Sequence, residues 1–336
     1  MPSNTKVPFT FAHIRRKVST FERAIKHAEE TKSRQSKLEH TTKKGIAVGN
    51  RKRFVWGALI LSALAATASL AYASTYTIID ASTFGINTKG DIVGAYFIGG
   101  GGPHHGFLLH RGTFSTLDVP GTLQTAARGI NPQGDIVGDC NTSAGGTHGF
   151  LLHEGSYQTI VDPPGSVSTV AVGINSQGDI VGDYDDAAGR THGFLLHEGG
   201  FTIIDIPGAF ATYVFGINGD GDIVGASTPG DARGVHSFLF RNGVFTTIDV
   251  PGAFATYAAG INTQGDIAGT YTHREPIPVY PYFGYPPHGF LVHKGKFTTI
   301  DLPGSTSTQV LGINDRGSVV GIYTDGHDVQ HGFLVK

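Results

Sequence analysis

The sequence predicts an all-β fold, a six-bladed β-propeller with four-stranded antiparallel blades whose last blade is closed by both termini of the domain. The first observation is a triplet, Gly-Ile-Asn, that recurs with steps of 44, 44, 43, 44 and 52 residues. The second is that each unit holds four strand-like runs divided by turn signals, without helical periodicity. A repeat of this length and content is typical of propeller blades. The triplets begin at Gly85, Gly129, Gly173, Gly216, Gly260 and Gly312.

The fourth copy shows how one unit is expected to fold. Its strands are predicted at residues 211–218, 222–226, 236–241 and 244–250. The first turn has the composition of a type I turn, as in the second copy, where Asn131 and Pro132 precede Gly134. Asn242-Gly243 is a two-residue hairpin signal. The Pro-Gly pair that follows the fourth run cannot continue a ladder and ends it.

The two ends of the repeat region are complementary. Residues 331–336 form a third strand with no fourth after it, and residues 76–80 form a fourth strand with no third before it. Joining them completes a sixth blade and leaves no unpaired sheet edge. A β-solenoid is the alternative architecture, but its rungs are shorter and its turns are less hairpin-like.

Charge divides the chain into segments. Residues 1–53 contain 14 Lys/Arg and 4 Asp/Glu, whereas residues 74–336 contain 11 and 23, a net charge of 11 − 23 = −12. We expect residues 1–53 to be a basic cytoplasmic or leader segment and residues 74–336 to be the propeller. An acidic domain without a basic stripe argues against nucleic acid as a partner.

Residues 54–73 contain no charged side chain and follow Arg51-Lys52-Arg53. They have the layout of a secretory signal, with a small-x-small cleavage site at Ala71-Tyr72-Ala73. Alternatively, this segment is an uncleaved membrane anchor, because about 20 apolar residues can span a bilayer. Either interpretation predicts an exported domain that is periplasmic, extracellular or at the cell surface, with a membrane contact only through residues 54–73.

The cassette resembles the HAF-type repeats of predicted extracellular bacterial proteins, which are named for a His-x-Phe signature. The resemblance covers residues 76–336 and implies export and a repeat fold, but no established activity. WD-repeat and kelch propellers have a similar four-strand layout, yet the only tryptophan is Trp56, which precedes the repeats in the apolar segment 54–73. His-Gly-Phe begins at His105, His148, His192, His288 and His331, with His236-Ser237-Phe238 as a variant.

The repeated histidines are expected to be structural. Equivalent histidines on third strands lie too far apart to share a metal ion. We expect each to bond the Asp that ends the fourth strand, because polar groups between blades need partners. These residues are Asp118, Asp162, Asp205, Asp249, Asp301 and, for the closing blade, Asp80. No cofactor is expected, although Asp183, Asp185 and Asp186 offer a calcium alternative.

A binding site is expected where the repeat is broken. The connection between the second and third strands is doubled in the fifth copy, over residues 272–287. Aromatic rings on a proline-stiffened loop lose little entropy on binding. Arg128 is a second candidate, because other copies have no charge before Gly-Ile-Asn. The loop candidates are His273, Arg274, Tyr280, Tyr282, Phe283 and Tyr285.

These observations predict a monomeric, non-catalytic binding propeller that recognises a glycan or a protein surface. One alternative is an enzyme, a propeller-type lyase or glycoside hydrolase with its site at the mouth of the channel. The loop acids form no recognisable catalytic pair, so no catalytic residue is assigned. A passive envelope protein is the third alternative.

Overall fold

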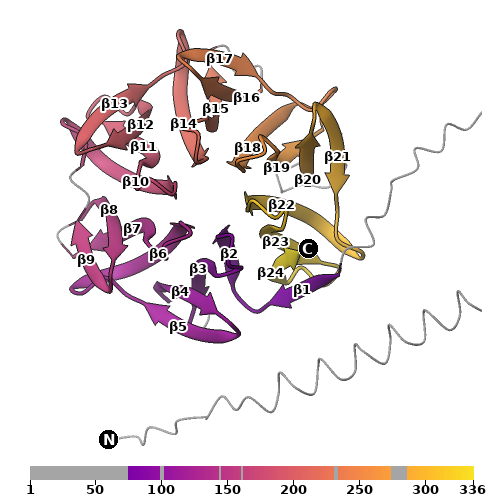
Figure 1. Ribbon diagram of the computed structural model, residues 1–336, viewed down its shortest axis with the longest axis horizontal. Helices are drawn as coiled ribbons and strands as arrows, with labels where there is room; N and C mark the ends of the chain where they lie inside the picture. The colour runs from indigo at the N-terminus through magenta and orange to yellow at the C-terminus, as the bar shows by residue number, and fades with distance from the viewer. Residues whose placement is uncertain (1–74, 99–101, 144, 160–161, 231–233, 274–285) are drawn as a thin grey trace, which may run out of the picture. The chain divides into compact units, whose positions relative to one another are not determined.

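A computed structural model describes residues 75–98, 102–143, 145–159, 162–230, 234–273 and 286–336. Six four-stranded antiparallel sheets surround one axis, which confirms the six-bladed propeller (Figure 1). No helix long and apolar enough to cross a bilayer occurs in these ranges. The basic segment, residues 1–53, and the apolar segment, residues 54–73, lie outside them.

Five blades are continuous in sequence. Blade 1 holds β2 (Ser82–Ile86), β3 (Ile92–Phe97), β4 (His104–His110) and β5 (Thr113–Leu117). Blade 2 holds β6 (Thr122–Ile130), β7 (Ile136–Thr142), β8 (Thr147–His153) and β9 (Ser156–Thr159). Blade 3 holds β10 (Ser166–Ile174), β11 (Ile180–Asp186), β12 (Thr191–His197) and β13 (Gly200–Ile204). Blade 4 holds β14 (Ala209–Ile217), β15 (Ile223–Pro229), β16 (His236–Arg241) and β17 (Val244–Thr247). Blade 5 holds β18 (Ala255–Ile261), β19 (Ile267–Thr272), β20 (His288–His293) and β21 (Lys296–Ile300).

Blade 6 joins the two ends of the domain as expected. It holds β22 (Ser305–Ile313), β23 (Val319–Asp325) and β24 (Gln330–Val335), and its outermost strand is β1 (Tyr76–Ile79). Tyr76 is opposite Val335, and Ile79 is opposite Gly332. The first described strand therefore closes the ring against the last one.

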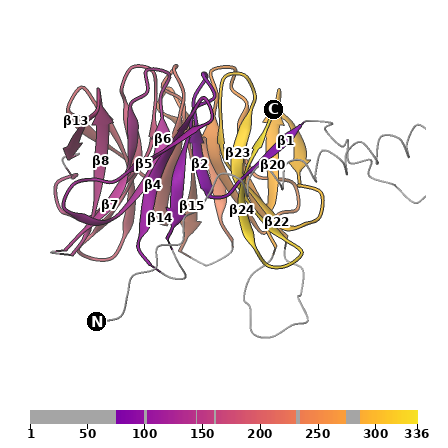
Figure 2. The ribbon, with the colours of Figure 1, turned by 90° about the horizontal axis from the view of Figure 1, so that it is seen from below.

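The connections between strands emerge on two faces of the ring (Figure 2). We call the face with the first and third turns of each blade the hairpin face. The opposite face, with the second connection of each blade and the passage from one blade to the next, is the crossover face. Because the strands alternate in direction, each innermost strand runs from the crossover face to the hairpin face.

Two motif residues interlock in every blade. The phenylalanine of His-x-Phe is almost fully buried in all six blades. In blade 1 its ring lies against Gly94 of the neighbouring strand, where an added Cβ would be 2.7 Å from the Phe107 ring and 1.9 Å from the carbonyl oxygen of Ser82. Only glycine fits at this position. This packing explains why the Ile-Val-Gly and His-x-Phe motifs occur together.

The innermost strands converge on the glycines of the six triplets. A Cβ added to Gly129 would lie 3.2 Å from the Cα atom of Gly173 in the next blade, and the same close approach recurs around the ring. The residue before each of these glycines forms a β-bulge in all six blades. The bulged residues are Phe84, Arg128, Val172, Phe215, Ala259 and Leu311.

Candidate functional site

A closed belt of hydrogen bonds surrounds the axis on the hairpin face. The side-chain amide of each triplet asparagine donates to the backbone carbonyl of the triplet asparagine in the next blade, and Asn314 donates to Asn87 to close the circle. All six side chains are almost fully buried. Because every amide has a partner, this belt joins the blades without leaving an unsatisfied polar group.

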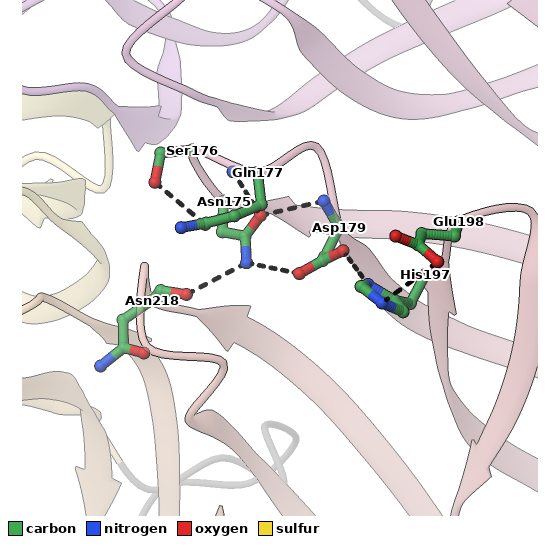
Figure 3. A network of polar contacts seen from close by, with 7 residues as sticks. All are labelled: Asn175, Ser176, Gln177, Asp179, His197, Glu198 and Asn218. Carbon is green, nitrogen blue, oxygen red and sulfur yellow. Dashed lines mark hydrogen bonds and ion pairs between the residues drawn. The ribbon is translucent and has the colours of Figure 1, made fainter.

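The belt extends outward through the Gly-Asp turns. Asn175 Nδ2 donates both to the carbonyl oxygen of Asn218 and to Asp179 Oδ2, at 2.9 Å from the latter. Asp179 Oδ1 in turn lies 2.5 Å from Nδ1 of His197 at the end of β12 (Figure 3). Equivalent Asp–His contacts occur in blades 1, 2 and 5, and Arg241 replaces the histidine in blade 4. Blade 6 lacks both groups, since Ser318 and Lys336 occupy the two positions.

These contacts raise the pKa values of two of the outer histidines, His197 and His153. The hydrogen bond that Asp179 accepts from His197, and then the negative charge of Asp179, raise the pKa of His197. Asp135 raises the pKa of His153 in the same way. The sequence signal for this network is the asparagine present in all six triplets. From the sequence, this asparagine is expected only to form its own turn.

The repeat histidines lie at the opposite end of the third strands, on the crossover face. In blades 1 to 5 their Nδ1 atoms contact the Asp that follows the fourth strand, at 2.7–2.9 Å. His192 also contacts Asp186 through Nε2, at 3.3 Å. Burial opposes protonation of His192, but its hydrogen bonds to Asp205 and Asp186 outweigh burial and raise its pKa.

Blade 6 differs from the expected pairing. Among the described residues, no hydrogen bond joins His331 to Asp80. Instead, Nε2 of His331 contacts Asp325 Oδ2 at 3.3 Å. Its ring stacks on Tyr323, as His192 stacks on Tyr184 in blade 3. The turn after β23 places Asp325 beside His331, as the equivalent turn in blade 3 places Asp186 beside His192. In blade 6 the histidine therefore contacts an acid on this turn instead of Asp80.

A pocket of about 220 Å³ opens on the crossover face between blades 3 and 4. Phe210, near the start of β14, lines it with 59% of the residue exposed. Its polar lining includes Arg190, Thr191, His192 and Asp205. A second pocket of about 260 Å³ shares the crossover segment 206–209 and reaches His236 and Phe245 of blade 4. The pocket region therefore combines an exposed aromatic ring with hydrogen-bonding groups.

A charged cluster lies near the axis on blades 2 and 3. Arg128 Nε donates to Asp139 Oδ1, and the Arg128 guanidinium also lies 5.6 Å from the centre of the Phe84 ring. Asp139 is almost fully buried, and Arg128 is about one-third exposed. Asp183 occupies the position in blade 3 that Asp139 occupies in blade 2. Burial raises the pKa of Asp183 to about 7; the charge of Arg128 opposes this shift, whereas those of Asp185 and Asp139 add to it.

Of the six residues predicted for the blade 5 loop site, only His273 lies within the described part of the chain. Arg274, Tyr280, Tyr282, Phe283 and Tyr285 lie outside the described residues. His273 lies at the junction of blades 4 and 5, where its Nδ1 is 3.3 Å from the carbonyl oxygen of Gly252 and its ring packs edge-on against Tyr271.

The calcium alternative at Asp183, Asp185 and Asp186 is not supported by the structure. Successive residues of a strand point to opposite sides of the sheet, so the three carboxylates do not converge. Asp185 accepts a hydrogen bond from Thr191, and Asp186 caps the turn through the amides of Ala188 and Arg190. Within the described ranges, no three His, Cys, Asp or Glu side chains are arranged to hold a metal ion.

Comparison with known proteins identifies the fold. No protein-family model and no curated protein sequence matches the chain. TolB from Acinetobacter baumannii is 12% identical with a TM-score of 0.51, over 73% of this chain and 63% of that chain. A gluconolactonase from Xanthomonas campestris is 14% identical over 81% and 93% of the two chains (TM-score 0.46). The Aleuria aurantia lectin, in complex with Fucα1-6GlcNAc, is 11% identical over 78% and 92% (TM-score 0.45). At these identities the similarity concerns the propeller fold alone.

Proposed function

We propose that this chain is an exported, monomeric, non-catalytic binding protein that recognises a glycan through the crossover face of its propeller. The observation that carries the proposal is the pocket between blades 3 and 4. It places the exposed ring of Phe210 beside Arg190 and the His192–Asp205 pair. Export is supported by the apolar segment 54–73 behind Arg51-Lys52-Arg53 and by the resemblance to HAF-type repeats.

The chemistry of this pocket suits a sugar. An aromatic side chain presents a rigid apolar surface to the C–H face of a pyranose ring. Arg190 and Asp205 supply hydrogen-bond donors and acceptors for its hydroxyl groups. Small-ligand sites commonly combine an apolar wall with a few polar groups that fix orientation.

The surroundings allow contacts beyond one sugar ring. The second pocket lies across the segment 206–209, so an extended oligosaccharide can contact both pockets. Leu123 and Val167 are exposed at the positions in blades 2 and 3 that match Phe210. Phe97, at the end of β3, is exposed on the same face, as are Ile98 and Val329 on the second connections of blades 1 and 6.

The lining of the pocket favours binding over hydrolysis. Glycoside hydrolases use two carboxyl groups that flank the scissile bond. Asp205 is the one carboxylate among the residues that line the first pocket, and His192 already contacts it. An enzyme is the second candidate, because Asp139 and Asp183 place two carboxylates near the axis. Turnover of a glycan that is lost on Asp183→Asn would favour that candidate.

A glycan array with the full-length protein tests the proposal. We expect Phe210→Ala to weaken binding by at least about tenfold, because it removes the stacking surface. Arg190→Ala should weaken it by a similar factor. Val244→Ala is the matched control, because Val244 is 62% exposed and begins the fourth strand at the hairpin face. Equal loss of binding in the control, or none in Phe210→Ala, would refute the assignment.

The aromatic insertion of blade 5 remains a predicted part of the same face. Replacing residues 273–286 with the seven-residue connection of blade 3, residues 185–191, should leave the fold intact, because loop length has a small effect on stability. We expect the exchange to reduce glycan binding. Unchanged binding would restrict the site to the pocket between blades 3 and 4.

A further inference from the structure

Arg190 is a point at which the pocket between blades 3 and 4 departs from the repeat. It stands two residues before His192, and it lines the pocket together with the exposed ring of Phe210. The equivalent residues in the other five blades are uncharged; they are Pro103, Gly146, Gly234, Pro286 and Val329. A positive charge at this position is therefore specific to blade 3.

The turn that carries Arg190 does not require an arginine. The amide of Asp186 donates to the carbonyl oxygen of Arg190 at 2.9 Å, and Asp186 Oδ1 accepts a hydrogen bond from the amide of Arg190 at 2.9 Å. Blade 6 forms the same turn, in which Asp325 makes the corresponding contacts with Val329 at 2.9 and 3.0 Å. Because only backbone atoms of Arg190 hold the turn, its side chain is available for another role.

The acids beside the pocket already have partners. His192 contacts Asp205 through Nδ1 at 2.7 Å and Asp186 through Nε2 at 3.3 Å. Thr191 donates to Asp185 at 2.7 Å. Because both ring nitrogens of His192 face carboxylates, the imidazole satisfies both only when it is protonated. A protonated His192 then offsets part of the negative charge of the two carboxylates that it contacts.

The guanidinium of Arg190 is available to a ligand. Among the described residues, no ion pair or hydrogen bond involves its side chain. A guanidinium matches the planar geometry of a carboxylate, to which it can donate two parallel hydrogen bonds. Residues 74–336 contain 11 Lys/Arg against 23 Asp/Glu, so the domain as a whole repels anions. An acidic ligand therefore needs a local cation of this kind.

We propose that the glycan recognised between blades 3 and 4 is acidic, and that Arg190 binds the carboxylate of a uronic acid unit while the ring of Phe210 packs against a sugar face. This inference rests on the proposed function, because it assigns the charge of the ligand at the same pocket. Phe210 contributes affinity for acidic and neutral sugars alike. Arg190 distinguishes between them, because a neutral sugar leaves the guanidinium without a counter-ion.

Uronic acid trimers and their methyl esters provide matched probes, since esterification removes the charge and leaves the sugar rings unchanged. At about pH 6, we expect the full-length protein to bind a trimer of galacturonic, glucuronic or mannuronic acid at least about tenfold more tightly than its ester, measured by calorimetry. Arg190→Gln should remove this difference without lowering Tm, because the turn uses only backbone atoms of this residue. Arg190→Lys should retain part of it, since lysine keeps the charge but not the paired donors.

Two further variants separate this inference from the proposed function. Arg316→Gln is the matched control, because Arg316 is an exposed arginine on the hairpin face, and it should keep the preference for the acid. Binding of esters or neutral glycans that is lost in Phe210→Ala, without a preference for any of the three acids, overturns the inference and leaves the proposed function intact. A preference that persists in Arg190→Gln, or that Arg316→Gln removes equally, also overturns it. Binding to no glycan refutes the proposed function, and this inference with it.

Discussion

The asparagine belt and the axial cluster are both polar arrangements near the axis, but they differ in how often they recur and in how completely their groups are hydrogen-bonded. The belt occurs in all six blades, and each of its amides has a partner in the next blade. The cluster occurs only in blades 2 and 3, and it leaves Asp183 without a hydrogen-bond donor among the described residues. We infer that repeated polar groups stabilise the ring, whereas the unrepeated group reduces its stability. Substitutions in the two regions should therefore act in opposite directions.

The largest effect is expected at Asp183. Its pKa in the folded protein, about 7, is above the ordinary value of 3.8, so folding favours the protonated form. Stability should fall as the pH rises from about 4 to 7, and the full penalty should be present above pH 7. At pH 8, Asp183→Asn should raise the free energy of unfolding by at most about 4 kcal/mol, and the gain should vanish near pH 4. Urea unfolding of the variant and of the unsubstituted protein at pH 4 and pH 8 measures this difference in the free energy of unfolding. If Asp183→Asn lowered the free energy of unfolding at pH 8, the inference that this unrepeated carboxylate destabilises the ring would be wrong.

Asn175 provides the opposite test. Asn175→Ala removes hydrogen bonds to Asn218 and Asp179 and leaves backbone amides of its own turn without their acceptor. We expect the free energy of unfolding to fall by about 3 kcal/mol, because these groups are buried. Gln133→Ala is the control, since Gln133 makes an exposed hydrogen bond across the neighbouring junction, from blade 2 to Ser176 of blade 3. Equal stability of the two variants would show that the belt does not hold the blades together.

A smaller loss is expected at the repeat histidine of blade 3. His192→Ala removes the partner of Asp205 and one partner of Asp186, with an expected loss of about 1–3 kcal/mol. His327→Ala is the matched control, because the His327 side chain is 91% exposed. Stoichiometric zinc released by His192→Ala would contradict the structural role.

The smallest effect concerns the outer histidines of the belt. The pKa of His197 is raised in the folded protein, so its contribution to stability is full below the unfolded pKa and is lost as the pH rises through the folded value. We expect His197→Gln to flatten the decline in stability from about pH 6 to 8, measured by thermal unfolding. An unchanged pH profile would show that Asp179 does not favour the charged form of His197.

The fold could be predicted from the sequence because its signals are local and occur six times. The Asn-x-x-Gly turn in each copy specifies a hairpin, and the complementary ends at residues 76–80 and 331–336 specify closure. The belt was not predicted, because a single repeat does not show that Asn175 reaches Asn218 in the next blade. The cluster was not predicted either. The sequence shows that Arg128 deviates from the repeat. It does not show the β-bulge that turns Arg128 toward Asp139, because this bulge forms where the innermost strands converge.

The pairing of β1 with β24 has a consequence for how the chain reaches its folded state. Thr83 already contacts Phe333, 250 residues further along, and β1 lies still earlier in the chain. A chain that emerges from its N-terminal end exposes β1 without a partner until the last strand appears. Topologies dominated by such distant contacts fold slowly, and unpaired strands are prone to aggregate. During synthesis, the final strand therefore determines when the ring can close, and a chaperone that shields β1 would act only in that interval.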